Sequence, residues 1–253
     1  MPPIFQAVAQ AYRDLSHCLS ELRPLVVIVL LITLAFQTAE TLLLPPTAGE
    51  TSRTILLRFL SSLAQGFLTV PYYIAVHRLV ILGERTSSYV LAPSNLRFQQ
   101  FFWWWAALSV VTYLPIAFIE MLGPTRALTP LNLIVLVAMP VILIAIIIVT
   151  LRLTIIFPAV AVDAPGATWE NVMADTKGHV WRIFLFGLVA TLPLILPALL
   201  LGALGGLGSP SRSWIVSGFF LIFSSVLSVV GLTLFIIVAS LLYLWIGNRT
   251  KQP

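Results

Sequence analysis

The stretch LNLIVLVAMPVILIAIIIVTL, Leu131–Leu151, carries no charge and runs directly into RLTIIFPAVAVDAP, Arg152–Pro165. As a helix, the first stretch would be about 32 Å long at about 1.5 Å per residue. That length is enough to cross the hydrocarbon core of a bilayer, so Arg152 falls at a membrane boundary. Pro158 disfavours a helical conformation at Phe157. We therefore expect the chain to bend there and to lie along the boundary to the end of the stretch.

Composition indicates that the rest of the chain also belongs in a membrane. Of its 253 residues, 59% are hydrophobic and only 9% are charged, whereas soluble domains carry roughly 25% charged residues. The mean hydropathy is +1.03. A formal net charge of +5 is too sparse for a nucleic-acid partner, and the single cysteine, Cys18, excludes an internal disulfide. The sequence predicts an all-α, polytopic integral membrane protein.

Runs of about 20 apolar residues define the predicted organisation. Residues 1–24 are predicted to be a cytoplasmic amphipathic interfacial helix, 25–246 a six-helix transmembrane domain, and 247–253 a cytoplasmic tail. The last apolar stretch would be about 47 Å long as a helix, which is too short for two crossings and a turn, so we expect one long helix. The six predicted spans cover about 25–44, 56–82, 102–122, 131–151, 181–204 and 214–245.

Prolines and a second amphipathic segment refine this plan. Prolines lie within the second, fourth and fifth spans. Neighbouring helices satisfy the carbonyls that proline leaves without a partner, so we expect these three spans to pack inside the bundle. The segment 168–178 is predicted to be a second interfacial helix, with Thr168 as its N-cap and Gly178 as its C-terminal stop. The apolar stripe of the first interfacial helix comprises Ile4, Val8, Tyr12, Leu15, Leu19 and Leu22.

Basic residues are distributed unequally between the two sides of the predicted spans. With the N-terminus inside, ten Lys and Arg residues lie in inner segments and four in outer ones, and this bias sets orientation. Both termini are therefore predicted to be cytoplasmic. Arginine pairs bidentately with phosphate, so the inner cations are also candidates for binding an anionic headgroup. These candidates are Arg78, Arg97, Arg152, Arg182 and Lys177.

Five further charged residues are predicted to form ion pairs or to have a structural role. Glu84 and Asp163 lie beside the arginines of the inner face. Glu40, Arg58 and Glu120 lie within about two turns of the outer boundary, where a charge is costly unless it is paired or hydrated. We expect Arg58 to meet one or both outer acids and to clamp helices together. The alternative is an outward-facing polar cavity.

The sequence offers no catalytic or metal-binding pattern. It contains no G-x-S-x-G elbow and no phosphate-binding glycine loop. His17, His77 and His179 have no second ligand type at helical spacing, so no metal and no cofactor are predicted. The spans hold no acidic residue at mid-depth, which argues against ion-coupled transport. We therefore predict a non-enzymatic protein.

The quoted stretch also carries a short motif. The order R-x-x-x-x-x-P-A-x-A-x-D, followed by G-x-x-W-R, occupies residues 152–182. It resembles a family of uncharacterised bacterial six-span inner-membrane proteins, which is similar to the membrane module of glycerophosphoryl diester phosphodiesterases. The catalytic barrel of the fused enzymes would need roughly 250 residues of its own, and nothing in this sequence corresponds to it. The resemblance implies a bacterial inner-membrane module that has no catalytic activity of its own. Its residues are Arg152, Pro158, Ala159, Ala161, Asp163, Gly178, Trp181 and Arg182.

These features together predict a lipid-contacting or membrane-organising protein that holds an anionic headgroup at the cytoplasmic face, near Arg152 and Arg78. Membrane lipids are its predicted partners. The alternative is a scaffold or accessory subunit, which would bind a membrane protein or a second copy of the chain. A third reading is a transporter of small solutes or lipids. The scaffold would use small-residue helix faces such as Gly202, Gly206, Gly218 and Gly231.

Overall fold

The computed structural model describes residues 2–43, 52–121, 130–206 and 214–252, and all regular structure within these ranges is helical. The predicted all-α fold class is confirmed for this part of the chain. In chain order the helices are α1 (Ile4–Glu21), α2 (Arg23–Leu43), α3 (Ser52–Leu82), α4 (Leu96–Met121), α5 (Pro130–Leu153), α6 (Ile156–Ala161), α7 (Trp169–Asp175), α8 (Val180–Gly206) and α9 (Trp214–Ile246).

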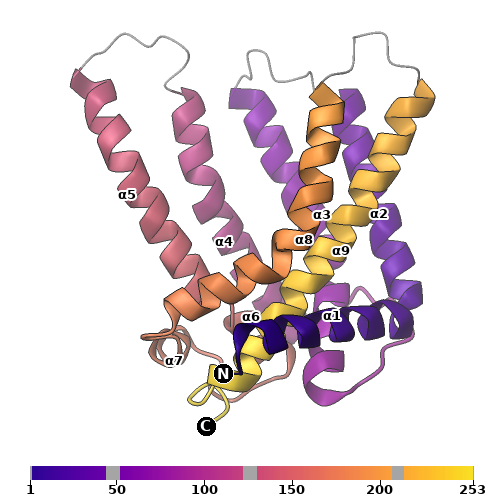
Figure 1. The fold of residues 1–253 in the computed structure, drawn as a ribbon, viewed down its shortest axis with the longest axis vertical. Coiled ribbons are helices and arrows are strands. Elements are labelled where there is room, and N and C mark those ends of the chain that lie inside the picture. Colours follow the sequence, from indigo (N-terminus) through magenta and orange to yellow (C-terminus); the bar gives the residue numbers. More distant parts are fainter. Residues whose placement is uncertain (1, 44–51, 122–129, 207–213, 253) are drawn as a thin grey trace.

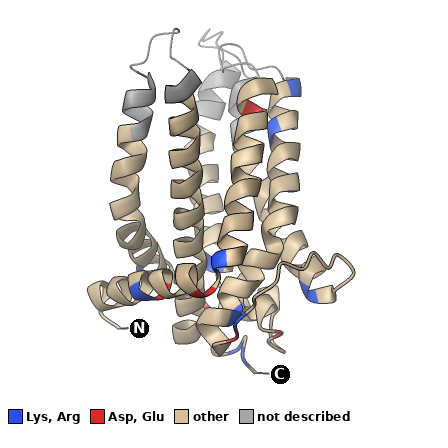
Figure 2. Cartoon of the chain, turned by 90° about the vertical axis from the view of Figure 1, so that its right-hand side faces the viewer, with Lys and Arg blue, Asp and Glu red and all other residues tan. Residues whose placement is uncertain are grey.

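Five helical segments are long and apolar enough to cross a membrane, so the protein is membrane-embedded. Within the described residues, α4 is not one of the five. Figure 1 shows the long helices running between two common ends. We call the end that carries both termini, together with α1, α6 and α7, the terminal end. Figure 2 shows charged residues gathered mainly there. The five segments are Arg23–Leu43, Arg53–Leu82, Ala138–Ala161, Val180–Leu200 and Ser217–Ile246.

At the terminal end, α1 lies across α8 and α9. Its packing line differs in part from the predicted stripe. Leu15 and Leu22 belong to both, whereas the other four residues of the stripe are only half-buried. Small side chains on this line let two helices approach closely, and an inspection of the large apolar residues alone overlooks them. The buried positions are Ala7, Ala11, Leu15, Cys18 and the following Leu22.

The centre of the bundle is α9, which packs against α2, α3 and α8. Several polar side chains of α9 face these neighbours and are hydrogen-bonded to them. Tyr72 shares a hydrogen bond of 2.5 Å with Thr233, and His77 Nδ1 shares one of 2.7 Å with Ser240. Ser225 Oγ donates to the side-chain oxygen of Gln37 at 2.8 Å. Interhelical hydrogen bonds of this kind hold membrane helices in register.

The helix that contains Arg152 ends earlier than the bend that the sequence predicted at Phe157. Helix α5 ends at Leu153, a turn occupies residues 154–155, and α6 follows at once. Pro158 is the third residue of α6, where the helix needs no N–H donor from it. Helix α6 is buried among α3, α4 and α9 at the terminal end. Its expected place along the membrane boundary stays a prediction.

Figure 1 shows that α8 bends partway along its length, and Pro193 and Pro197 lie inside it. The hydroxyl of Tyr12 donates a hydrogen bond of 2.9 Å to the carbonyl of Ala190, within a turn of the first proline. The second, fourth and fifth spans were expected to pack inside the bundle. This is wrong for α5, which is exposed around Pro140, and for α8 around its two prolines, where no residue from Thr191 to Leu200 is buried. A single proline frees one carbonyl, and this requires one local partner rather than burial of a whole helix.

Candidate functional site

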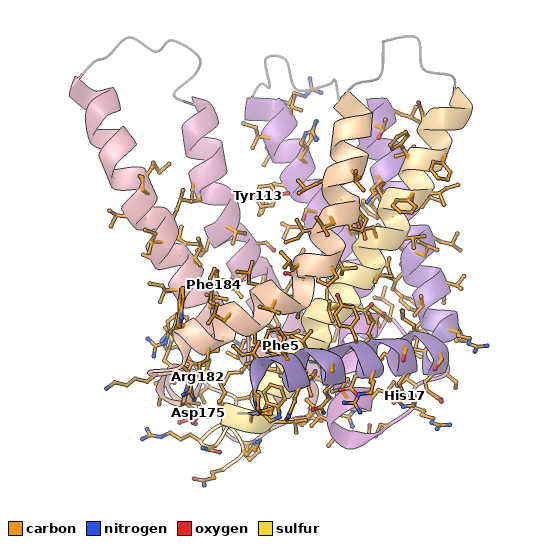
Figure 3. The ribbon with its side chains drawn as sticks, viewed as in Figure 1. Phe5, His17, Tyr113, Asp175, Arg182 and Phe184 are labelled. Atoms are coloured by element: carbon orange, nitrogen blue, oxygen red, sulfur yellow. The ribbon has the colours of Figure 1, made fainter. Side chains whose placement is uncertain are left out.

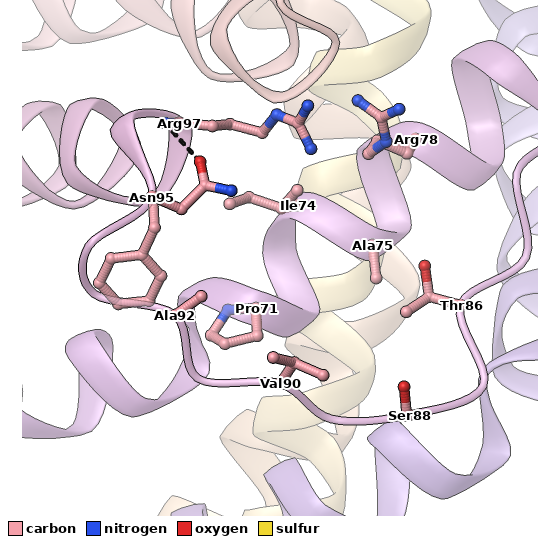
Figure 4. A pocket seen from close by; sticks show the side chains of 11 residues that line it. Pro71, Ile74, Ala75, Arg78, Thr86, Ser88, Val90, Ala92, Asn95 and Arg97 are labelled. Atoms are coloured by element: carbon pink, nitrogen blue, oxygen red, sulfur yellow. Dashed lines mark hydrogen bonds between the residues drawn. The ribbon is translucent and has the colours of Figure 1, made fainter.

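A cavity of about 270 Å³ lies at the terminal end, between α3, α4 and the segment 83–95 that connects them. Figure 4 shows the guanidinium groups of Arg78 and Arg97 close together at one side of it. The connecting segment closes it with the hydroxyl groups of Thr86 and Ser88. We call this the arginine cavity. Its remaining lining is mainly apolar and includes Pro71, Ile74 and Phe98.

Two carboxylates hold the arginines of this cavity. Arg97 forms a two-pronged ion pair with Asp163, in which Nε donates to Oδ1 at 2.7 Å and Nη2 donates to Oδ2. Arg78 donates to Glu84 Oε2 through Nε at 2.7 Å and lies 3.4 Å from Asp163 Oδ2 through Nη1. The same Nη1 donates to the carbonyl of Ala161 at 3.0 Å. The cluster therefore joins α3, α4 and α6.

Asp163 is positioned by the way α6 ends. Its φ of 53° is in the left-handed region, which Asp tolerates better than most residues. The N–H of Ala164 reaches back to the carbonyl of Ala159 at 2.9 Å, and the N–H of Asp163 reaches that of Val160 at 3.2 Å. This is a Schellman termination. The hydrogen bonds from Arg97 hold the pKa of Asp163 below its ordinary value, and Arg78 adds to the effect.

Arg152 lies away from the arginine cavity and has a different set of contacts. Its Nε donates to Thr176 Oγ1 at 3.2 Å, and its Nη2 donates to the carbonyl of Met173. Arg152 thus ties the end of α5 to α7. Lys177 and Arg182 make no hydrogen bond or ion pair with the described residues. Arg182 instead lines a separate cavity of about 350 Å³ beside the N-terminus of α1.

The outer charged set is described only in part. Glu40 accepts a hydrogen bond of 2.7 Å from Ser61 Oγ, which joins α2 to α3. Arg58 is half-buried on α3. The side chain of Glu120 lies outside the described residues. The predicted contact between Arg58 and Glu120 therefore stays a prediction. Of the small-residue positions, Gly202 and Gly206 also fall outside the described side chains.

Asp175 is a structural anchor at the terminal end that sequence reasoning missed. Its carboxylate accepts hydrogen bonds of 3.0 Å from the N–H groups of Arg249 and Thr250, and one of 3.1 Å from the Thr250 hydroxyl. The C-terminal tail is therefore anchored to α7. The sequence did contain one signal. An acidic residue in the last turn of a helix interacts unfavourably with the helix dipole, so a hydrogen-bond donor is expected beside it. Figure 3 labels Asp175 at the terminal end.

The predicted second interfacial helix corresponds to α7, and its local signals agree with the structure. Thr168 Oγ1 accepts a hydrogen bond from the N–H of Asn171, as the N-cap prediction requires. Gly178 has a φ of 78° after the end of the helix. Cys18 of α1 is buried, and burial raises the pKa of its thiol to about 12. It therefore remains a neutral thiol.

Fold and site together define an α-helical, membrane-embedded protein with a charged cluster at one end of its bundle. Within the described ranges, no three His, Cys, Asp or Glu side chains come together in a group that could hold a metal ion. Comparisons with family models, with curated proteins and with solved structures give no match to this chain. Its function must therefore be inferred from the site alone.

Proposed function

We propose that this is a non-enzymatic, six-span membrane protein that holds a phospholipid headgroup in the arginine cavity. In this proposal α4 is the sixth span. Its 26 residues would extend about 39 Å as a helix, and it lies beside α3 and α5. Both termini then face the cytoplasm, because the terminal end carries most of the basic residues. The resemblance described above supports a bacterial inner membrane.

The position of the cavity along α4 supports contact with headgroups. Trp103 is 67% exposed and Trp181 is 68% exposed, and exposed tryptophans gather at the boundary between headgroups and hydrocarbon. Arg97 precedes Trp103 by six residues, which corresponds to roughly 9 Å along the helix. In this proposal the guanidinium group lies at the depth of lipid phosphates.

The observation that carries the proposal is a set of uncommitted donors within the cavity. The fork to Asp163 uses Nε and Nη2 of Arg97, and it leaves Nη1 with no hydrogen bond to any described residue. The hydroxyls of Thr86 and Ser88 likewise make none within the described residues. Guanidinium and hydroxyl groups are strong donors to phosphate oxygens. A phosphate beside Arg97 would engage its free nitrogen. The hydroxyls of Thr86 and Ser88, which lie away from Arg97 on the connecting segment (Figure 4), offer donors to other oxygens of the same headgroup.

Native mass spectrometry of the protein released from mild detergent tests this function. We expect the wild type to retain phospholipid, and the double variant Thr86→Val, Ser88→Ala to retain at least about threefold less, the size of one lost exposed hydrogen bond. These substitutions leave the ion cluster intact. Ser87→Ala is the matched control, because Ser87 is exposed and does not line the cavity. Equal retention by the wild type and the double variant contradicts the proposal.

A scaffold role is the second candidate, and the exposure of α5 favours it. Between Pro140 and Ile148, every residue of α5 is exposed except Ile146, which is half-buried. A partner helix could cover this surface, although lipid chains cover bulky aliphatic residues equally well. The same mass spectra decide between lipid contact and a scaffold role. A complex with a second protein that retains no lipid favours the scaffold.

A further inference from the structure

We propose that the arginine cavity selects a headgroup that carries both a phosphate and a primary ammonium, as phosphatidylethanolamine does. This inference rests on the proposed lipid contact and names its chemical class. The first argument is the charge balance of the cluster. Two guanidiniums, Arg78 and Arg97, contact two carboxylates, Glu84 and Asp163. The formal charge of the four side chains is zero, so a headgroup with a net negative charge gains little long-range attraction.

The second argument is that the cluster offers acceptors as well as donors. Both nitrogens with which Arg78 contacts Glu84 bind the same oxygen, Oε2. Glu84 Oε1 therefore makes no hydrogen bond with the described residues. The side chains of Glu84 and Asp163 are 50% and 54% exposed, so a ligand can reach both carboxylates. Neither carboxylate is among the residues that line the cavity, but each contacts an arginine that does. A zwitterion with its phosphate on Arg97 and its ammonium beside the cavity, on Glu84, would be complementary to this arrangement.

The third argument concerns hydrogen bonding by the ammonium group. A primary ammonium has three N–H donors, and its hydrogen bonds to a carboxylate are charge-assisted. A trimethylated ammonium carries the same charge but no N–H donor. The cavity should therefore distinguish ethanolamine from choline, although both headgroups are zwitterionic. A glycerol headgroup has no positive charge to meet Glu84.

Neighbouring apolar surface can accommodate the lipid chains. A second hollow of about 420 Å³ lies on α4, lined by Leu96, Trp103, Trp104 and two glutamines. Leu96 and Trp103 are each 67% exposed, and Leu96 is adjacent to Arg97 in the chain. A lipid with its phosphate on Arg97 would have this apolar surface within reach of an acyl chain.

A competition experiment tests the inference. The detergent-solubilised protein is equilibrated with equal amounts of phosphatidylethanolamine, its mono- and dimethylated forms, phosphatidylcholine and phosphatidylglycerol, all with identical acyl chains. Native mass spectrometry then counts each bound lipid. We expect retention to fall with each methyl group, to about three- to fivefold less for choline than for ethanolamine, the size of an exposed charge-assisted contact. This methylation series needs no variant.

A variant pair assigns the selectivity to the cluster. Glu84→Gln should bring the ethanolamine-to-choline ratio close to one and raise the share of phosphatidylglycerol. Glu170→Gln is the control, because Glu170 is an exposed acid on α7; its ratio should equal that of the wild type. Equal retention of ethanolamine and choline, or preference for glycerol, overturns the inference but leaves lipid contact standing. Retention of no lipid by the wild type overturns both.

Discussion

Helices α5 and α9 have similar hydropathy and opposite packing. The candidate span Ala138–Ala161, which covers the second part of α5 and continues through α6, has a mean hydropathy of 2.7, and the span Ser217–Ile246 of α9 has one of 2.6. From Thr233 to Ile246, α9 is buried at all but three positions, whereas from Pro140 to Ile148 no residue of α5 is buried. Hydropathy alone therefore places both helices in a membrane but does not tell which of them lies at the centre of the bundle.

The difference between the two helices lies in their small and polar residues. Between Ala138 and Val149, α5 has no polar side chain. In α9, Ser225, Thr233 and Ser240 are buried, and each shares a hydrogen bond with α2 or α3. In a membrane, apolar area does not drive helices together, because lipid chains are equally apolar; small and hydrogen-bonding residues do so. These residues make α9 the central helix.

Adding bulk to each helix should give the largest contrast. Ser225→Leu forces a large side chain into a fully buried position between α9 and α2, so we expect a loss of about 1–3 kcal/mol in the free energy of unfolding. Ala145→Leu makes a similar change on the exposed surface of α5 and should change the free energy of unfolding by no more than about 0.5 kcal/mol. Thermal unfolding in detergent measures both. Equal destabilisation would show that another chain covers α5.

Two glycines extend the contrast to α3 and α8. A Cβ on Gly66 would overlap the indole of Trp105, whereas a Cβ on Gly187 would meet nothing within 4 Å. Gly66→Ala should therefore cost about 1–2 kcal/mol. Gly187→Ala should be neutral or should stabilise by up to about 1 kcal/mol, because alanine is the better helix former. The same unfolding assay applies, and a neutral Gly66→Ala would contradict the close approach of α3 and α4.

The tail of α9 offers a test at the terminal end. Asp175→Ala removes the acceptor for the N–H groups of Arg249 and Thr250. We expect tryptic cleavage after Arg249 and Lys251 to become about tenfold faster, which corresponds to about 1.4 kcal/mol of lost docking. Glu170→Ala removes an exposed acid from the same helix and should leave cleavage unchanged. If both variants are cleaved at the wild-type rate, Asp175 does not hold the tail.

Single hydrogen bonds along α9 should have smaller effects. Thr233→Val removes the partner of the Tyr72 hydroxyl, and such interhelical bonds contribute about 0.6 kcal/mol on average. Thr112→Val is the control, because Thr112 is exposed and bonds only to carbonyls of its own helix. The difference between the two variants in chemical or thermal unfolding gives the value of one polar contact. A larger loss of unfolding free energy for Thr112→Val than for Thr233→Val would contradict the stabilising role of the hydrogen bonds between α9 and its neighbours.

The smallest effect should be the pH dependence contributed by Asp163. Arg97 holds the pKa of this carboxyl below its ordinary value. A lowered pKa stabilises the folded state above the ordinary pKa of Asp, about 3.9, and this contribution is lost as the pH falls through the lowered value. The melting temperature of the wild type should exceed that of Asp163→Asn by a constant amount from about pH 7 to 5, and the gap should shrink below about pH 4. A gap that widens on acidification would contradict the ion pair.

The sequence predicted the class of fold because composition and helical periodicity suffice for it. The N-cap at Thr168 and the positive φ after α7 also followed from local residue preferences. The burial of α6 did not, because Pro158 can either break a helix or begin one. Which of the two occurs depends on contacts with α3, α4 and α9, whose residues lie far away in the sequence.

The candidate site was predictable in its residues but not in its pairing. Arg78, Arg97, Glu84 and Asp163 were all singled out, and the structure brings them together. Arg152 was expected among them, yet it binds α7 instead. Arg152 and Asp163 are close in the sequence, but the turn after α5 changes the direction of the chain between them. Their separation in the sequence therefore does not predict that Arg152 contacts α7.

The hydrogen bond between Tyr12 and Ala190 has a consequence for biosynthesis. The two residues are separated by 178 positions, and translation at about 5–20 residues per second needs roughly 10–35 s to produce that length. Helix α1 also packs on α9, which emerges later still. Helix α1 therefore waits for α8 and α9 to be synthesised before it can take its final place. A chain that stalls before α8 would present the apolar line of α1 to chaperones and proteases.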